Sequence, residues 1–191
     1  MHEHVEHLAP QADALLADAT SPASPEKPSN SLASIVGKIA AMLGSDRFPS
    51  ADRAALRRYG QGQPIPLAFY RLWLQLQDEL PKGNAALSAW AVLVCAMARG
   101  GPKSHQYGKP FGSALFESGY SEARLERLLS ADADVQLTLF DSTSRFLAAK
   151  GASFDWTDAA ALLFSKEEGR QERARRKIAE SYYTAQRRAS K

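Results

Sequence analysis

The stretch KSHQYGKPFGSALFESGYSEARLERLL, residues 103–129, decides how the rest of the chain is organised. It opens as a polar loop, and Pro110 suits the first turn of a following helix because its missing N–H costs nothing there. Gly119 ends that helix and a second one follows. On the second helix Arg124 and Arg127 lie three residues apart, on a different side from the leucines. The pattern predicts a surface that holds an anion; the alternative is a solvated loop with an ordinary amphipathic helix.

The polar loop carries three further candidate anion ligands, Lys103, His105 and Lys109. His105 is the one histidine outside the first seven residues, and no neighbouring carboxylate is placed to orient it as a general base. The chain also lacks a Gly-rich phosphate loop, HExxH, CxxC and G-x-S-x-G. The sequence therefore predicts a protein that is not an enzyme and has no metal or cofactor.

The composition is that of a soluble globular protein, with 45 % hydrophobic and 24 % charged residues among 191. The net charge of +3 is unevenly placed. Residues 1–31 carry one lysine against five acids, whereas residues 166–191 carry nine Lys and Arg against four acids. Arginine suits phosphate because its planar fork donates two hydrogen bonds at once. The single Cys95 excludes a disulfide framework and no signal peptide is evident, so we expect a cytoplasmic protein.

Three regions follow from the distribution of apolar residues. Residues 1–30, rich in Pro, Ser and acids, are expected to be a disordered tail. Residues 31–101 are expected to form an N-terminal helical bundle. Within it, residues 67–80 are apolar on most sides and residues 85–98 are almost wholly apolar, but the second run is shorter than the roughly 20 residues of a bilayer span. We therefore predict two central core helices, centred on Trp73 and Trp90, and no membrane contact.

The remaining residues, 102–191, are expected to form a C-terminal bundle with a basic final helix. No segment alternates with period two over a useful length, so no sheet is expected. The prediction is an all-α protein of about eight or nine helices in two packed bundles, with a hinge near residues 100–110. Two basic groups lie outside the loop, one on an early short helix and one along the final helix: Arg53, Arg57, Arg58, Arg170, Arg173, Arg176 and Lys177.

Several segments, in this order and spacing, resemble the small subunit of the type I-E CRISPR Cascade surveillance complex, the CasB family. They are ALRRYG (55–60), IPLAFYRLW (65–73), SHQYGKPFGSALFESG (104–119) with EARLERLL (122–129), and FDW (154–156) before a basic helix ending YYTAQ (182–186). The resemblance covers about residues 32–188. It implies an all-α subunit without a nuclease site, active in antiviral defence.

The resemblance also implies partners. Two copies of such a subunit lie along the complex beside its backbone and large subunits, and hold guide RNA, target DNA and the displaced strand through Arg and Lys. Arg57, Arg58 and Arg124 match basic positions of the family's motifs, while the final helix matches only its general basic tendency. Ser113 and Asp141 stand where family members often have a basic residue, so the resemblance leaves open how tightly this chain grips DNA at these two positions.

The residues themselves support contact with phosphates rather than bases, because basic clusters lie on helices with few aromatic residues available for stacking. Two alternatives remain. One is a helix-turn-helix regulator, with residues 50–60 leading into residues 65–80 as a recognition helix, although that helix is mostly apolar. The other is a purely structural helical scaffold.

Overall fold

The computed structural model describes residues 31–76, 80, 83–165 and 167–191, so the expected tail lies outside the described residues. Over these ranges the chain forms nine helices and no strand, which confirms the all-α prediction. Their bounds are α1 Leu32–Gly44, α2 Ser50–Arg58, α3 Leu67–Leu76, α4 Asn84–Gly100, α5 Phe111–Glu117, α6 Glu122–Ser130, α7 Ala133–Ala149, α8 Trp156–Phe164 and α9 Glu168–Ala189.

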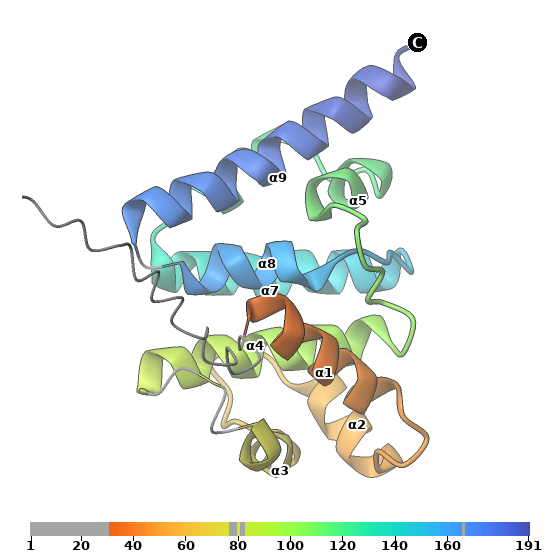
Figure 1. Cartoon of the computed structure of the whole chain (residues 1–191), viewed down its shortest axis with the longest axis vertical. Coiled ribbons are helices and arrows are strands. Elements are labelled where there is room, and N and C mark those ends of the chain that lie inside the picture. Colours follow the sequence, from red (N-terminus) through yellow and green to blue (C-terminus); the bar gives the residue numbers. More distant parts are fainter. Residues whose placement is uncertain (1–30, 77–79, 81–82, 166) are drawn as a thin grey trace, which may run out of the picture.

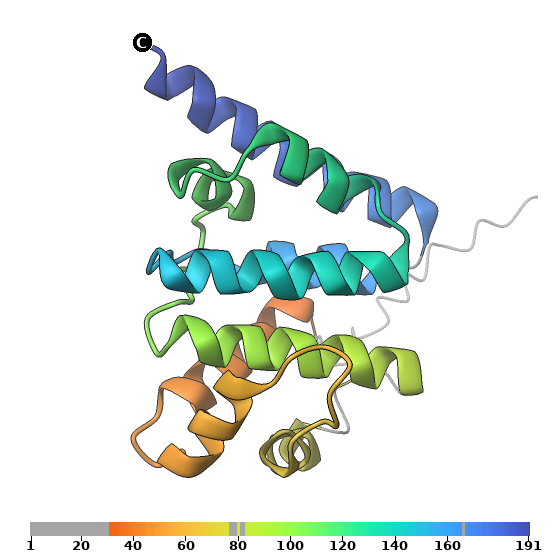
Figure 2. The same cartoon turned by 180° about the vertical axis from the view of Figure 1, so that it is seen from behind.

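The helices are stacked in layers, which Figures 1 and 2 show from opposite sides. The long α9 forms one end with α5 and α6, α7 and α8 form the middle, and α4 lies below them with α1. The short α2 and α3 form the other end. α4 packs against α7 and α8, and α1 also reaches α8. Buried apolar side chains from both sides of Gly101 belong to one continuous cluster. The division of the chain into an N-terminal and a C-terminal bundle stays a prediction.

The helix α4 is the centre of the core, as its sequence predicts. Every residue from Ala89 to Ala98 is buried. Trp90 is fully buried and its ring stacks on Phe164 of α8 with centroids 4.2 Å apart. Cys95 is also fully buried, and burial raises the pKa of its thiol to about 12. The thiol therefore acts as a small apolar side chain rather than a nucleophile.

The prediction that the helix beginning at Leu67 is central is wrong. α3 lies at the end of the molecule (Figure 1) and buries one side only, through residues such as Phe69 and Leu72. Leu67 and Leu74 are 73 % and 63 % exposed, and Trp73 is only partly buried. Apolar residues on most sides of a helix indicate burial only when neighbours cover each side, and here a single side is covered.

A close contact between α5 and α9 fixes the other end of the molecule. A Cβ added at Gly112 would lie 2.0 Å from the carbonyl oxygen of Ile178, which is backbone and cannot move aside easily. Tyr182 of α9 packs edge-to-face against Phe116 and donates a hydrogen bond of 2.6 Å to the carbonyl of Tyr120. The glycine in the FGS sequence therefore permits α9 to lie directly on α5.

Candidate nucleic-acid interface

The first basic group lies where the end of α2 meets the end of α4. Arg57 donates from Nε to the carbonyl of Ala98, at 3.0 Å, in the last turn of α4, where this carbonyl also accepts from the N–H of Gly101. Arg58 and Lys103 are exposed and form no hydrogen bond or ion pair within the described ranges. Arg53 differs, because its guanidinium donates to the carbonyls of Leu43 and Ser45, at 3.2 and 2.8 Å, and closes the end of α1.

The polar loop before α5 is held against the start of α8. Asp155 caps α8 and also accepts a hydrogen bond from the N–H of Gly108. Burial would raise the pKa of Asp155, but the hydrogen bonds from Thr157 and Gly108 outweigh it and lower the pKa. His105 accepts a 3.4 Å hydrogen bond at Nδ1 from the Trp156 N–H. The histidine is thus a structural partner of α8.

Lys109, the last cation of the loop, forms a 2.8 Å ion pair with Glu117 of α5. Its charge is therefore partly balanced within the protein. Of the three loop residues that the sequence predicts as anion ligands, Lys103 alone has neither a hydrogen bond nor an ion pair in the described part of the chain.

The second basic group faces a cavity between α6 and α7. Arg124 and Arg127 project from α6, are exposed, and have no ion-pair partner among the described residues. The cavity has a volume of about 370 Å³. Its other walls are Tyr120, Leu139, Ser142 and Phe146.

The third group, on α9, is only partly free. Lys177 forms a 2.6 Å ion pair with the buried Asp158, and this hydrogen bond raises the pKa of the lysine. Arg170 pairs with Glu167 at 2.8 Å on an exposed surface. Arg173 and Arg176 are exposed and lack a hydrogen bond or ion pair in the described ranges.

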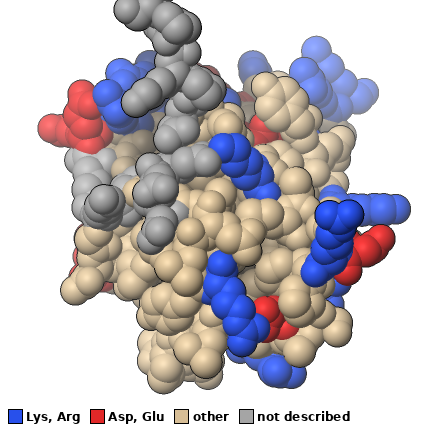
Figure 3. Space-filling view, turned by 60° about the horizontal axis from the view of Figure 1, so that its bottom comes forward, with Lys and Arg blue, Asp and Glu red and all other residues tan. Residues whose placement is uncertain are grey.

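The three groups do not merge by direct contact. α2 packs on α4, α4 on α7 and α7 on α6, so α4 and α7 lie between the helix that carries Arg58 and the helix that carries Arg124 (Figure 2). On the face that Figure 3 presents, Lys and Arg side chains stand in separate groups on a largely uncharged surface, with acids beside some of them. The geometry suits several spaced contacts along an extended anion rather than one deep binding site.

Sequence reasoning missed Arg145, which lies between the first two groups. Its guanidinium donates to Asp141 from Nε, at 3.2 Å, and to the carbonyl of Tyr59 at the end of α2, at 2.8 Å, while the side chain stays 46 % exposed. Arg145 follows Ser142 by three residues and precedes Lys150 by five, and its neighbour Phe146 shares the cavity with Ser142. This run of polar, basic and aromatic residues, from Ser142 to Lys150, is the sequence pattern that could have indicated Arg145 as part of the interface.

The two positions that lack a basic residue both face the interior. Asp141 is 8 % exposed and binds Arg99 and Arg145, which links α4 to α7. Ser113 donates a 3.2 Å hydrogen bond to the carbonyl of Ser181 on α9. Both residues therefore serve the packing of the helices.

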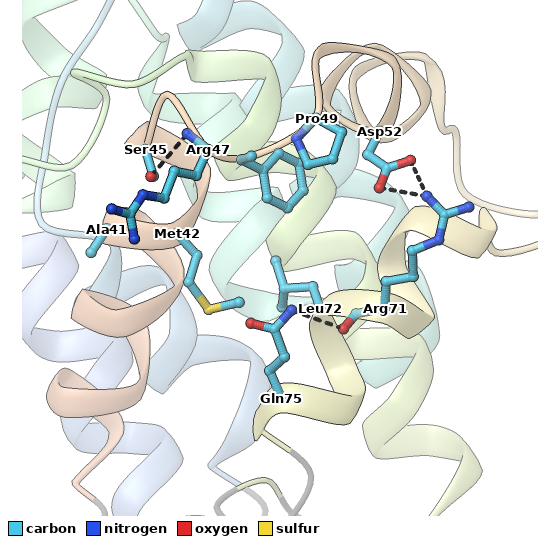
Figure 4. A pocket seen from close by; sticks show the side chains of 10 residues that line it. Ala41, Met42, Ser45, Arg47, Pro49, Asp52, Arg71, Leu72 and Gln75 are labelled. Carbon is cyan, nitrogen blue, oxygen red and sulfur yellow. Dashed lines mark hydrogen bonds and ion pairs between the residues drawn. The ribbon is translucent and has the colours of Figure 1, made fainter.

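A hollow between the α1–α2 loop and α3, of about 480 Å³, differs from the basic groups (Figure 4). Its floor is apolar, with Met42 and Leu72, and on its rim Arg71 pairs with Asp52 at 2.5 Å. A second arginine of the lining, Arg47, is exposed, and its guanidinium has no hydrogen bond or ion pair in the described residues, so the hollow keeps one unpaired cation beside the neutralised Arg71.

The described residues contain neither a cluster of metal ligands nor a membrane-spanning helix. No group of three or more His, Cys, Asp or Glu side chains is gathered closely enough there to hold a metal ion. None of the helices within the described ranges has the length and apolarity needed to cross a membrane.

Comparison with known proteins places the chain in a family. The family model described as CRISPR-associated protein Cse2 matches residues 52–183, which include both helices of the α6–α7 cavity. The fold is similar to a chain in the crystal structure of E. coli Cascade bound to a PAM-containing dsDNA target, with a TM-score of 0.57 and 18 % identity. The match covers 78 % of this chain and 96 % of that one. No curated protein gives a significant match. The chain belongs to the CRISPR-associated Cse2 family, the small subunit of type I-E Cascade.

Proposed function

We propose that this chain is a non-catalytic Cascade subunit that holds guide RNA and target DNA, including the displaced strand, through phosphate contacts independent of sequence. Family membership supports the Cascade role, since the similar E. coli chain comes from a complex bound to target DNA. We infer a cytoplasmic location, contact with the backbone and large subunits, and a second copy as further partner.

One observation carries the proposal. Six of the predicted basic residues are exposed on helices or at a helix end and have no acidic partner in the described ranges: Arg58, Lys103, Arg124, Arg127, Arg173 and Arg176. Exposed cations without an internal partner remain available to phosphate oxygens. Such contacts position a protein on nucleic acid without reading its sequence, which suits a complex in which guide pairing supplies specificity.

The helix-turn-helix alternative fails on α3, the helix that would have to enter the major groove. Its outward side presents Leu67, Tyr70 and Leu74, and its one arginine, Arg71, pairs with Asp52. A recognition helix needs polar or basic side chains that reach base edges.

A salt titration of binding to two unrelated duplexes tests the proposal. Six phosphate contacts correspond to a slope of log affinity against log salt of about −5, at roughly 0.9 per contact. We expect a steep slope and equal affinity for both duplexes. Preference for one sequence would support a regulator, and no binding at low salt, together with failure to co-purify with guide RNA and other Cascade subunits, would support a scaffold.

A further inference from the structure

The helix α6 has two chemically different sides. Glu122 and Glu126 line a groove towards α9, where Glu122 accepts a 2.7 Å hydrogen bond from the Tyr183 hydroxyl. Arg124 and Arg127 line the cavity towards α7 instead. The acids of α6 form no ion pair with these arginines, so both guanidinium groups remain available at the cavity.

The cavity adds an aromatic wall to these two cations. Phe146 of α7 is half-buried, with its ring centroid 5.5 Å from that of the buried Tyr120. Tyr120 is held in place because its hydroxyl shares a 2.7 Å hydrogen bond with Thr143. Lys150, which is not part of the cavity wall, places its Nζ 6.0 Å from the Phe146 ring centroid. A fixed aromatic surface thus lies within a basic, concave site.

We propose that this cavity holds one nucleotide of an unpaired strand, with its phosphate on Arg124 and Arg127 and its base against Phe146. The volume of about 370 Å³ lies in the range of small-ligand sites. Two arginines three residues apart can each donate paired hydrogen bonds to phosphate oxygens. A base can reach an aromatic ring only when it is not stacked within a duplex, so the site favours single strands.

This inference rests on the proposed function and makes one part of it more specific. Arg58 and Lys103 are exposed and have no acidic partner in the described residues, so this group should contact phosphates of single and double strands alike. The two groups therefore differ in what they use of the ligand: the cavity binds phosphate of any strand and gains affinity from an unpaired base, whereas the other group binds phosphate alone.

The test compares three labelled ligands of equal length by fluorescence anisotropy: oligo-dT, a duplex, and an abasic oligomer with the same number of phosphates. We expect the full chain to bind oligo-dT roughly fivefold or more tightly than the abasic oligomer. Phe146→Leu, which keeps an apolar side chain beside Tyr120, should remove that difference and leave duplex binding unchanged. The matched control Arg58→Ala should weaken all three ligands by the same factor.

A second variant guards against misfolding of Phe146→Leu. Arg124→Ala with Arg127→Ala changes only exposed side chains, and it should flatten the salt slope on oligo-dT by about 1.4 and abolish the advantage over the abasic strand. Equal binding of oligo-dT and the abasic oligomer by the parent chain would overturn the inference while leaving the proposed function intact. Displacement of oligo-dT by micromolar dTMP would identify a free-nucleotide site and would also overturn it. Absence of binding to every ligand would refute the proposed function itself.

Discussion

Replacing Asp141 by alanine should destabilise the protein, because it leaves Arg99 and Arg145 without their acidic partner. The carboxylate binds Arg99, whose side chain is only 7 % exposed, and Arg145. Removing one partner of a buried ion pair costs about 3–5 kcal/mol, because the other charge stays buried without compensation. Arg99 would keep its hydrogen bonds to the Tyr59 carbonyl and the Ser144 hydroxyl, both 2.9 Å, so we expect the lower end, about 3 kcal/mol.

For a chain of this size, about 3 kcal/mol corresponds to a fall in melting temperature of roughly 6–12 °C. Thermal unfolding followed by circular dichroism measures it. Asp46→Ala is the matched control, because Asp46 is exposed and has no hydrogen bond or ion pair in the described ranges, and it should leave the melting temperature within about 1 °C. A fall of less than 2 °C in Asp141→Ala would show that the ion pairs do not join α4 to α7 as described.

Three further changes test the packing. Trp90→Ala should cost about 3–5 kcal/mol in urea unfolding, and Trp73→Ala clearly less because its side chain is only partly buried; equal losses would refute the peripheral position of α3. Gly112→Ala should sharply lower the melting temperature because its Cβ would meet the Ile178 carbonyl, and an unchanged value would contradict the close contact of α5 and α9. Cys95 should resist iodoacetamide at pH 8 until the protein is unfolded, and rapid alkylation of the native protein would contradict its burial. The folded pKa of its thiol, about 12, exceeds the unfolded value of 9.0, so its contribution to stability is present below pH 9 and is lost as the pH rises towards 12.

Local signals in the sequence predicted local structure well. Asp132 and Asp134 are both possible caps for the helix before Val135, and the structure has Asp132 as the cap, accepting a hydrogen bond from the Val135 N–H. Gly119 has a φ of +80° after α5, where chain reversal favours glycine. The almost wholly apolar run of α4 predicted that this helix is buried, and its residues from Ala89 to Ala98 are.

Pairing between distant residues could not be predicted in the same way. The partner of Lys177 is Asp158 on another helix, and the partner of Arg57 is a backbone carbonyl 41 residues away. Counting charges along the sequence therefore overestimates the cations that are available to a ligand. Asp141 illustrates the same limit. In the sequence it stands where family members often have a basic residue, but in the structure its carboxylate pairs with Arg99 and so joins α7 to α4.

The central claim is that available cations, rather than cations in general, bind nucleic acid. Its most direct test is the salt slope for random-sequence duplex DNA in two double variants that remove the same formal charge. Arg58→Ala with Lys103→Ala removes two unpaired cations and should flatten the slope by about 1.8, whereas Arg71→Ala with Arg170→Ala removes two cations already paired with Asp52 and Glu167 and should leave it nearly unchanged. Equal flattening in both variants would contradict the account.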